Sequence, residues 1–126
     1  MILVLTGNGK GKTTSALGTA LRAAGWGQKT AIVFFDKGGD YYGEQQALEG
    51  LRDRIDVFRF GLPRFDEAGK SFRLENTAED AAQAKAALEK VRELLSGGYF
   101  LVIADELLNA LRLGLVDEAS VREAVE

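Results

Sequence analysis

The chain has 126 residues, of which 46% are hydrophobic, 16 are basic and 19 are acidic, giving a net charge of −3. This length and apolar content predict one domain with its own core, and the acidic balance argues against a nucleic-acid partner. The chain has no cysteine or histidine, which excludes disulfides, thiolate or imidazole catalysis and the usual zinc sites, so any metal would be a hard cation with oxygen ligands.

The first feature along the chain is a short apolar run followed by a glycine-rich turn. Residues 2–5 predict a buried strand, residues 6–14 carry three alternating glycines, and residues 16–21 begin an amphipathic helix. A strand, a glycine-rich turn and a helix start are the context of a phosphate-binding loop, although a tight strand-to-helix connection is the plainer alternative. The apolar run is too short for a signal peptide or a membrane span, so we expect no membrane partner and a cytoplasmic protein.

In such a loop, glycines let successive N–H groups face an anion, and the helix N-terminus adds partial positive charge. Lys12 would act as the main cation on the phosphates, with Lys10 as a second, and the Thr13 hydroxyl would bind Mg²⁺. The candidate nucleotide-binding residues of the turn are Gly7, Asn8, Gly9, Lys10, Gly11, Lys12, Thr13 and Thr14.

The remaining elements alternate between strand and helix. Residues 29–35 are β-branched and aromatic and predict a second buried strand. Residues 44–52 have helical spacing, residues 55–60 alternate as in a strand near the sheet edge, and residues 99–104 predict a fourth strand. This order implies a parallel sheet with helices on both faces.

A long helix is predicted before the fourth strand and a short one at the end of the chain. Asn76 and Glu79 have the spacing of a capping box, and two glycines at 97–98 end the helix. The expected inner positions of the two helices are Ala81, Ala84, Leu88, Val91 and Leu95, and then Val121, Ala124 and Val125.

The fourth predicted strand runs into an acidic pair, Asp105 and Glu106. An apolar strand that ends in carboxylates is typical of a Walker B site, in which one carboxylate holds Mg²⁺ and the other orients it. Acidic residues also often begin a helix, so the interpretation of this pair as a Walker B site depends mainly on the presence of the loop at 6–14. Parallel strands present both motifs at the same edge of the sheet.

The sequence resembles the P-loop family of ATP:corrinoid adenosyltransferases in order from residue 1 to about residue 126. The match is carried by residues 6–14, 20–27 and 35–38, by Gly43 and Glu44, and by 105–107. The resemblance implies a RecA-like P-loop fold, a three-layer α/β protein with a parallel sheet. It also implies a homodimer that transfers the 5′-deoxyadenosyl group of ATP to cob(I)alamin and releases triphosphate, with a flavin or flavodoxin-type reductant supplying the electron.

By the same resemblance, Lys12 and Glu106 are the expected catalytic residues, and Thr13, Asp105 and Glu106 are the expected Mg²⁺ site. Further contacts to ATP or the corrinoid are expected from Asn8, Arg22, Lys37, Glu44 and Phe65. Arg22 is equally well explained as a solvated charge on a helix, and the segment with Lys37 and Glu44 as a solvated turn.

The sequence departs from the family pattern at several points. Asp36 occupies a position where an apolar residue is expected, and Phe65 stands where relatives place a tryptophan that shields the corrin ring. The tryptophan of this chain, Trp26, lies in the turn after the first helix, where we expect it to pack. The sequence also lacks an extension before the first strand.

The family continues into another strand soon after residue 126, and in RecA-like order that strand lies between the Walker B strand and the strand at 2–5. We therefore expect the 126 residues to be a fragment, or the ordered part, of a longer protein that lacks its C-terminal strand here. The alternative is a kinase-type order in which residues 2–5 pair directly with residues 100–104.

Two other functions remain open at this stage. A P-loop ATPase or kinase with another substrate would use Glu106 to polarise a water molecule and would release ADP. A non-catalytic ATP- or corrinoid-binding module would bind nucleotide without turnover.

Overall fold

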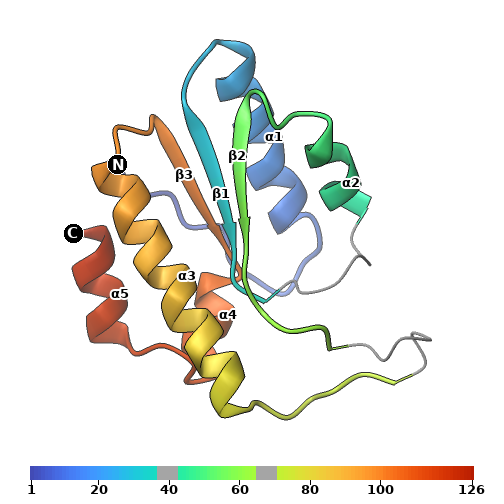
Figure 1. The fold of residues 1–126 in the computed structure, drawn as a ribbon, viewed down its shortest axis with the longest axis vertical. Coiled ribbons are helices and arrows are strands. Elements are labelled where there is room, and N and C mark those ends of the chain that lie inside the picture. Colours follow the sequence, from blue (N-terminus) through green and yellow to red (C-terminus); the bar gives the residue numbers. More distant parts are fainter. Residues whose placement is uncertain (37–42, 65–70) are drawn as a thin grey trace.

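A three-stranded parallel sheet forms the centre of the protein in the computed structural model, which describes residues 1–36, 43–64 and 71–126. The strand order is β2-β1-β3, and the strands are β1 (Thr30–Phe34), β2 (Ile55–Arg59) and β3 (Leu101–Asp105) (Figure 1). Thr30 at the start of β1 is in register with Ile55 and with Leu101, so all three strands end at one edge of the sheet. We call this the carboxyl edge.

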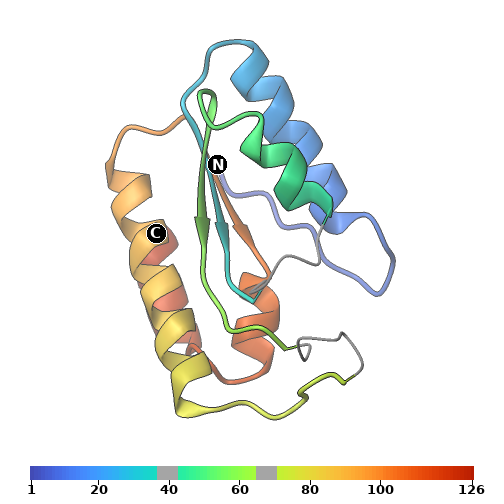
Figure 2. The ribbon, with the colours of Figure 1, turned by 45° about the vertical axis from the view of Figure 1, so that its right-hand side comes forward.

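Helices cover both faces of the sheet. Figure 2 shows α1 (Lys12–Gly25) and α2 (Gly43–Glu49) on one face and the other three helices on the opposite face. Those three are α3 (Ala78–Ser96), α4 (Leu107–Arg112) and α5 (Glu118–Val125). The expected three-layer α/β architecture is therefore confirmed for the described residues.

The alternation of side chains along β1 explains how one strand supports two cores. Ile32 and Phe34 point into a cluster with residues of α1 and α2, whereas Ala31, Val33 and Phe35 join a cluster with α3, α4 and α5. Successive side chains of a strand point to opposite faces, so a continuous apolar run is stable only where both faces are covered. The prediction of a buried strand at residues 29–35 is confirmed, as is the position of β2 near the sheet edge.

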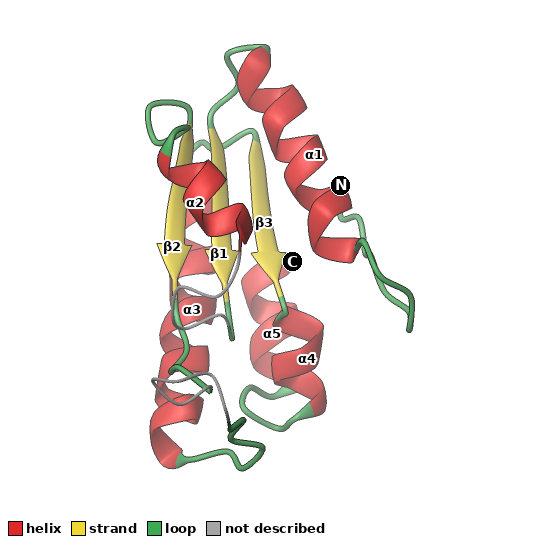
Figure 3. Cartoon of the chain, turned by 90° about the vertical axis from the view of Figure 1, so that its right-hand side faces the viewer, coloured by secondary structure: helices red, strands yellow, loops and turns green. Residues whose placement is uncertain are grey.

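The predicted strand at residues 2–5 is absent from the structure, in which these residues are an exposed irregular stretch. Ile2 and Leu3 are 65% and 74% exposed. A strand needs a neighbour to receive its backbone hydrogen bonds, and among the described residues β3 pairs with β1 alone. Figures 1 and 3 show the amino-terminal stretch beyond β3, on the side away from β1. The described residues thus show no direct pairing of 2–5 with β3, and the strand expected between them stays a prediction.

The open edge of β3 has a measurable consequence. Residues of a parallel strand direct their N–H groups alternately to the two sides, so about half of the β3 amides lack a strand partner in the described chain. We expect amide hydrogen exchange to be slow throughout β1 and to alternate between slow and fast along β3. Uniform protection of β3 would show that another segment or a second copy pairs with this edge.

Helix α3 begins one residue later than its sequence pattern suggested. The N-cap is Thr77, whose hydroxyl accepts from the Asp80 N–H while the Asp80 carboxylate accepts from the Thr77 N–H. The capping box predicted at Asn76 and Glu79 is therefore wrong by one position. The pattern fits both pairs, but only Asp80 also receives the Arg73 guanidinium, at 2.6 and 2.9 Å.

The inner face of α3 also differs at its last turn. Leu94 is 3% exposed, whereas Leu95, the predicted inner residue, is 48% exposed. Ala87 and Leu94 are seven residues apart, almost two full turns, and so share one face of the helix. At the other end of the chain, Ala124 is buried and Val121 and Val125 pack beside it, which confirms the predicted face of α5.

In the three described ranges, every helix is too short or too polar to serve as a membrane span. Trp26, expected to pack, is 79% exposed because it follows the end of α1 and extends away from the sheet core.

Candidate functional site

The loop before α1 has a backbone conformation that favours glycine. Gly7 and Gly11 have φ angles of 122° and 95°, which side-chain-bearing residues rarely adopt. A Cβ atom built at either position would meet no described atom within 4 Å. These glycines are therefore required by the course of the backbone and not by crowding.

The N-terminus of α1 is left available for an anion. Gly11 is the N-cap, and within the described chain no side chain caps the helix and no acidic residue lies in its first turn. The positive end of the helix dipole therefore faces the loop without a carboxylate from the first turn of the helix itself. The Lys12 ammonium donates to the carbonyl oxygen of Gly9, so it lies folded over the loop.

The decisive contact joins the first turn of α1, directly after the loop, to β3. The Thr13 hydroxyl donates to Asp105 Oδ1 at 3.0 Å in a partly buried position, although the two residues are 92 positions apart. Asp105 is the last residue of β3, so the contact lies at the carboxyl edge of the sheet. A hydroxyl and a carboxylate at this distance are oxygen ligands of the kind that Mg²⁺ prefers, which is the arrangement expected of paired Walker motifs.

Glu106 has a strained backbone beside this contact. It is the N-cap of α4 and has φ 65° and ψ 13°, a left-handed conformation that no other non-glycine residue shows in the described ranges. Such a conformation costs roughly 1–3 kcal/mol and persists where surrounding structure or function requires it. The strain turns the chain sharply from β3 into α4.

Replacing Glu106 with glycine should affect the stability of the fold and the binding of MgATP differently. Glycine adopts the left-handed conformation without steric cost, so we expect the free energy of unfolding to stay the same or to rise by about 1 kcal/mol. Mg²⁺-dependent ATP binding should weaken if Glu106 serves the metal. Denaturant unfolding and calorimetric titration with MgATP measure the two effects, and a loss of stability without a change in ATP affinity would contradict the assignment.

The other candidate residues lie at different distances from this contact. Asn8, Lys10 and Thr14 are exposed on or next to the loop, and Glu44 lies half-buried in the first turn of α2. Arg22 is exposed in the last turn of α1, about 15 Å along the helix from Lys12 at 1.5 Å per residue. Lys37 and Phe65 lie outside the described residues, so their roles stay predictions.

Comparison with known proteins gives the family. The model of the family described as ATP:corrinoid adenosyltransferase BtuR/CobO/CobP matches residues 1–126. The chain belongs to this adenosyltransferase family. It is 35% identical over 108 residues to the corrinoid adenosyltransferase of Escherichia coli K12, covering 85% of this chain and 51% of that protein.

Two further corrinoid adenosyltransferases are similar over more of the chain. That of Pseudomonas aeruginosa is 33% identical over 118 residues, covering 93% of this chain and 55% of the relative. That of a Sinorhizobium species is 35% identical over 123 residues, covering 96% and 55%. The chain thus spans about half the length of the curated relatives it matches.

In this member of the adenosyltransferase family, sequence reasoning missed an ion pair at the carboxyl edge. The Arg64 Nε donates to both carboxylate oxygens of Asp36, at 3.0 and 3.1 Å, and the two side chains are only 9% and 13% exposed. The departure at Asp36 was visible in the sequence, but nothing in the sequence connected it to a residue 28 positions away. The carboxylate that breaks the family's apolar pattern is therefore neutralised.

The clearest pKa changes lie away from the Thr13–Asp105 contact. The Arg73 guanidinium holds the pKa of Asp80 well below its usual range, and the backbone N–H of Ser120 lowers the pKa of Asp117 at the start of α5. The hydrogen bond to Asp56, at 2.6 Å, and partial burial raise the pKa of Tyr99 to about 12. These groups stabilise helix ends and strand packing.

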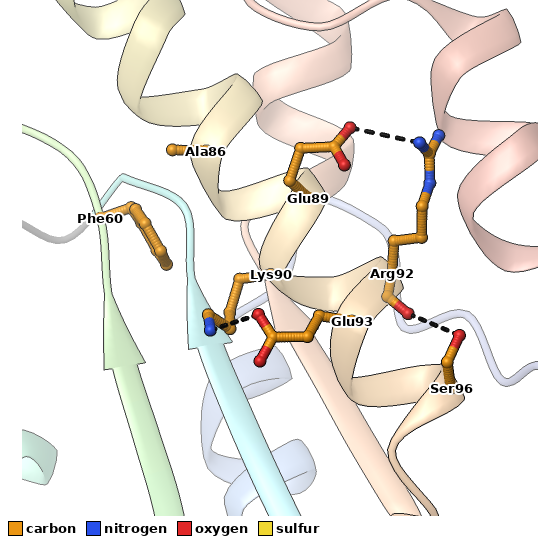
Figure 4. Close-up of a pocket in the computed structure, with 7 residues that line it drawn as sticks. All are labelled: Phe60, Ala86, Glu89, Lys90, Arg92, Glu93 and Ser96. Atoms are coloured by element: carbon orange, nitrogen blue, oxygen red, sulfur yellow. Dashed lines mark hydrogen bonds and ion pairs between the residues drawn. The ribbon is translucent and has the colours of Figure 1, made fainter.

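A surface hollow beside α3 does not belong to the candidate site described above. Figure 4 shows its lining, in which Lys90 pairs with Glu93 and Arg92 pairs with Glu89. It lies on the α3 side of the sheet, whereas the loop at 7–11 leads into α1 on the opposite side. Its charged groups are matched along one helix, as on an ordinary solvated surface.

Proposed function

We propose that this protein transfers the 5′-deoxyadenosyl group of ATP to the Co(I) centre of a corrinoid and releases triphosphate. The observation that carries the proposal is the hydrogen bond from Thr13 to Asp105, which unites a phosphate-binding loop with an acidic strand end. The family match over residues 1–126 supports the specific reaction. The names of the relatives support it as well.

The reaction requires little acid–base catalysis by the protein, which is compatible with a chain that has no histidine or cysteine. The Co(I) electron pair forms a bond to C5′ of the ribose, while the C5′–O5′ bond breaks and its electron pair leaves with triphosphate. The protein must orient the two substrates and stabilise the charge on the leaving group. Lys12, Lys10 and the N–H groups of residues 7–12 are the proposed contacts to the phosphates.

Mg²⁺ is the proposed metal, and the donors fit it. Thr13, Asp105 and Glu106 offer a hydroxyl and two carboxylates, all hard oxygen ligands. No group of three or more acidic, His or Cys side chains that could hold a metal occurs in the ranges that the structure covers. Mg²⁺ is usually bound by one or two carboxylates together with substrate phosphates and water. When bound, the metal would neutralise charge on the triphosphate.

The finer parts of the proposal follow from the family resemblance. We propose a homodimer, a flavin or flavodoxin-type protein as the source of the reducing electron, and contacts to ATP or the corrinoid from Asn8, Arg22, Lys37, Glu44 and Phe65. We also propose a cytoplasmic location, as expected from the sequence.

Incubation of the protein with MgATP and chemically reduced cobalamin tests the function. We expect a light-sensitive cobalt–carbon product and one triphosphate per product. Lys12→Met should lose this activity, whereas Lys85→Met, which removes an exposed lysine of α3, should keep it. Release of ADP and phosphate would instead indicate an ATPase or kinase, and ATP binding without turnover would indicate a binding module.

A further inference from the structure

Residues 73–77 form a short segment without regular secondary structure that leads into α3. Figures 1 and 2 show it passing below the ends of the strands, on the side of the molecule to which the strands point. Its one apolar side chain, Leu74, is 81% exposed, and among its five residues only Arg73 is partly buried. Burial of apolar surface therefore does not hold this segment, and its position depends on polar contacts. We call residues 73–77 the strap.

Arg64 fastens one side of the strap. Its Nη1 donates to the carbonyl oxygen of Arg73 at 3.3 Å, and its Nη2 donates to Asn76 Oδ1 at 3.0 Å. The Arg73 N–H in turn donates to the Arg64 carbonyl oxygen at 2.7 Å. The Arg64 guanidinium is itself held by Asp36, two residues beyond the end of β1, through the bidentate pair described above. A carboxylate therefore fixes the direction of the group from which these bonds to the strap start.

Asp80 fastens the other side of the strap. Its carboxylate accepts hydrogen bonds from both terminal nitrogens of the Arg73 guanidinium, at 2.6 and 2.9 Å, and from the Thr77 N–H at 2.7 Å. Arg73 Nη1 also donates to the carbonyl oxygen of Glu75 within the strap. Asp80 lies in the first turn of α3. The strap is therefore attached to the end of β1 through Arg64 and to the helix through Asp80.

The two attachments are connected within the strap. Arg73 is bonded through its backbone to Arg64 and through its side chain to Asp80. Asn76 accepts from Arg64, and the next residue, Thr77, donates to Asp80. Displacement of one strap residue therefore strains bonds on both sides. Segments with little apolar burial and few backbone hydrogen bonds open at a lower free energy than the core of a protein.

We propose that the strap opens and closes as one unit while the sheet and the helices stay folded, and that Arg64 is its latch. Removal of the guanidinium breaks the bonds to Asp36, to the Arg73 carbonyl oxygen and to Asn76 at once, so the strap loses its side-chain connection to the end of β1. Segments of low local stability are those that move when proteins bind ligands, and the strap lies on the side of the candidate site. The opening does not depend on the proposed reaction.

Native-state hydrogen exchange, followed amide by amide at low denaturant concentration, tests the latch. In the unmodified protein we expect the N–H groups of Arg73 and Thr77 to exchange faster than those of Ile32 and Val33 in β1, through an opening that exposes less surface than global unfolding. In Arg64→Met both strap amides should exchange at least about tenfold faster relative to the β1 amides, because hydrogen bonds to a charged group are lost. Arg64→Lys should act in the same direction, since an ammonium cannot form the same fork of bonds.

The Thr77 amide decides whether the strap moves as a unit. Its N–H donates to Asp80, and in the described part of the chain Arg64 bonds to neither of these two residues. Faster exchange at Thr77 in Arg64→Met therefore means that opening spreads along the whole strap. Acceleration confined to Arg73 would overturn the proposal, and so would unchanged exchange at both amides.

Two further variants separate the latch from general destabilisation. Asp36→Leu combined with Arg64→Met replaces the buried pair by apolar side chains, which often preserves or raises stability. We expect its β1 amides to exchange as in the unmodified protein while the strap amides stay fast. Return of the strap amides to slow exchange would mean that the uncompensated Asp36 charge caused the opening, and it would overturn the role of the latch. Arg52→Met, which removes an exposed arginine paired with Glu49, is the matched control and should leave exchange in the strap and in β1 unchanged.

Discussion

Replacing Thr13 with valine should lower the rate of adenosyl transfer by about 10²-fold or more, a loss comparable to removing one key electrostatic contact in other enzymes. The substitution keeps the shape of the side chain but removes the hydroxyl that donates to Asp105. The proposed Mg²⁺ site loses one of its oxygen ligands, and the leaving triphosphate is then less well neutralised. The rate should be measured across a range of Mg²⁺ concentrations, because weaker metal binding moves the half-saturation point upward.

A second threonine on the same helix provides the control. The Thr19 hydroxyl donates to the carbonyl oxygen of Ser15 within α1 and lies on the exposed face, so Thr19→Val should leave the rate and its Mg²⁺ dependence unchanged. Both variants lose one hydrogen bond, worth about 1 kcal/mol, so neither should unfold. Equal activities of the two variants would remove Thr13 from the site.

The sequence predicted the parts of the fold whose pattern is set locally. The run at 29–35 is apolar on both sides and could only be a strand covered on both faces, which is how β1 lies. The glycines at 7 and 11 marked the loop correctly because left-handed backbone positions favour glycine almost regardless of the rest of the molecule.

Where a structural feature depends on residues far away in the sequence, the prediction from the sequence was wrong or could not be made. Residues 2–5 have strand-forming side chains, but a strand also needs a neighbouring strand, and the described chain places none beside them. The capping box moved by one residue because Arg73 pairs with Asp80. In both cases the structure depends on contacts with residues that are not part of the local sequence pattern.

The candidate site divides in the same way. The glycine-rich loop and the acidic pair could be recognised from residue type and spacing, and the structure brings Thr13 and Asp105 into contact. The Arg64–Asp36 ion pair could not be predicted, because an arginine after Pro63 and an aspartate after β1 are each common on their own. Only the sheet, which places the ends of β1 and β2 side by side, makes them partners.

Asp80→Asn should destabilise the protein by about 2–4 kcal/mol at pH 7, because removal of one partner of a buried ion pair leaves the other charge without compensation. The Asp80 side chain is 2% exposed and joins Arg73 to the first turn of α3, where it also completes the capping box with Thr77. The Arg73 guanidinium, which is 31% exposed, can partly regain water, and this keeps the loss below that of a fully buried pair. Denaturant unfolding of both proteins at pH 7 gives the difference.

The pH dependence identifies the charge as the cause. The folded protein holds the pKa of Asp80 below its usual value, so the stabilisation is complete above the unfolded-state pKa of about 4 and is lost as the pH falls below it. The difference in unfolding free energy between the unmodified protein and Asp80→Asn should therefore shrink between about pH 4 and pH 2. Asp117→Asn, at the exposed cap of α5, replaces one favourable N-cap residue by another, so it should change stability little and serves as the matched control. A difference for Asp80→Asn that stays constant down to pH 2 would mean that packing of the side chain, and not its charge, holds the start of α3.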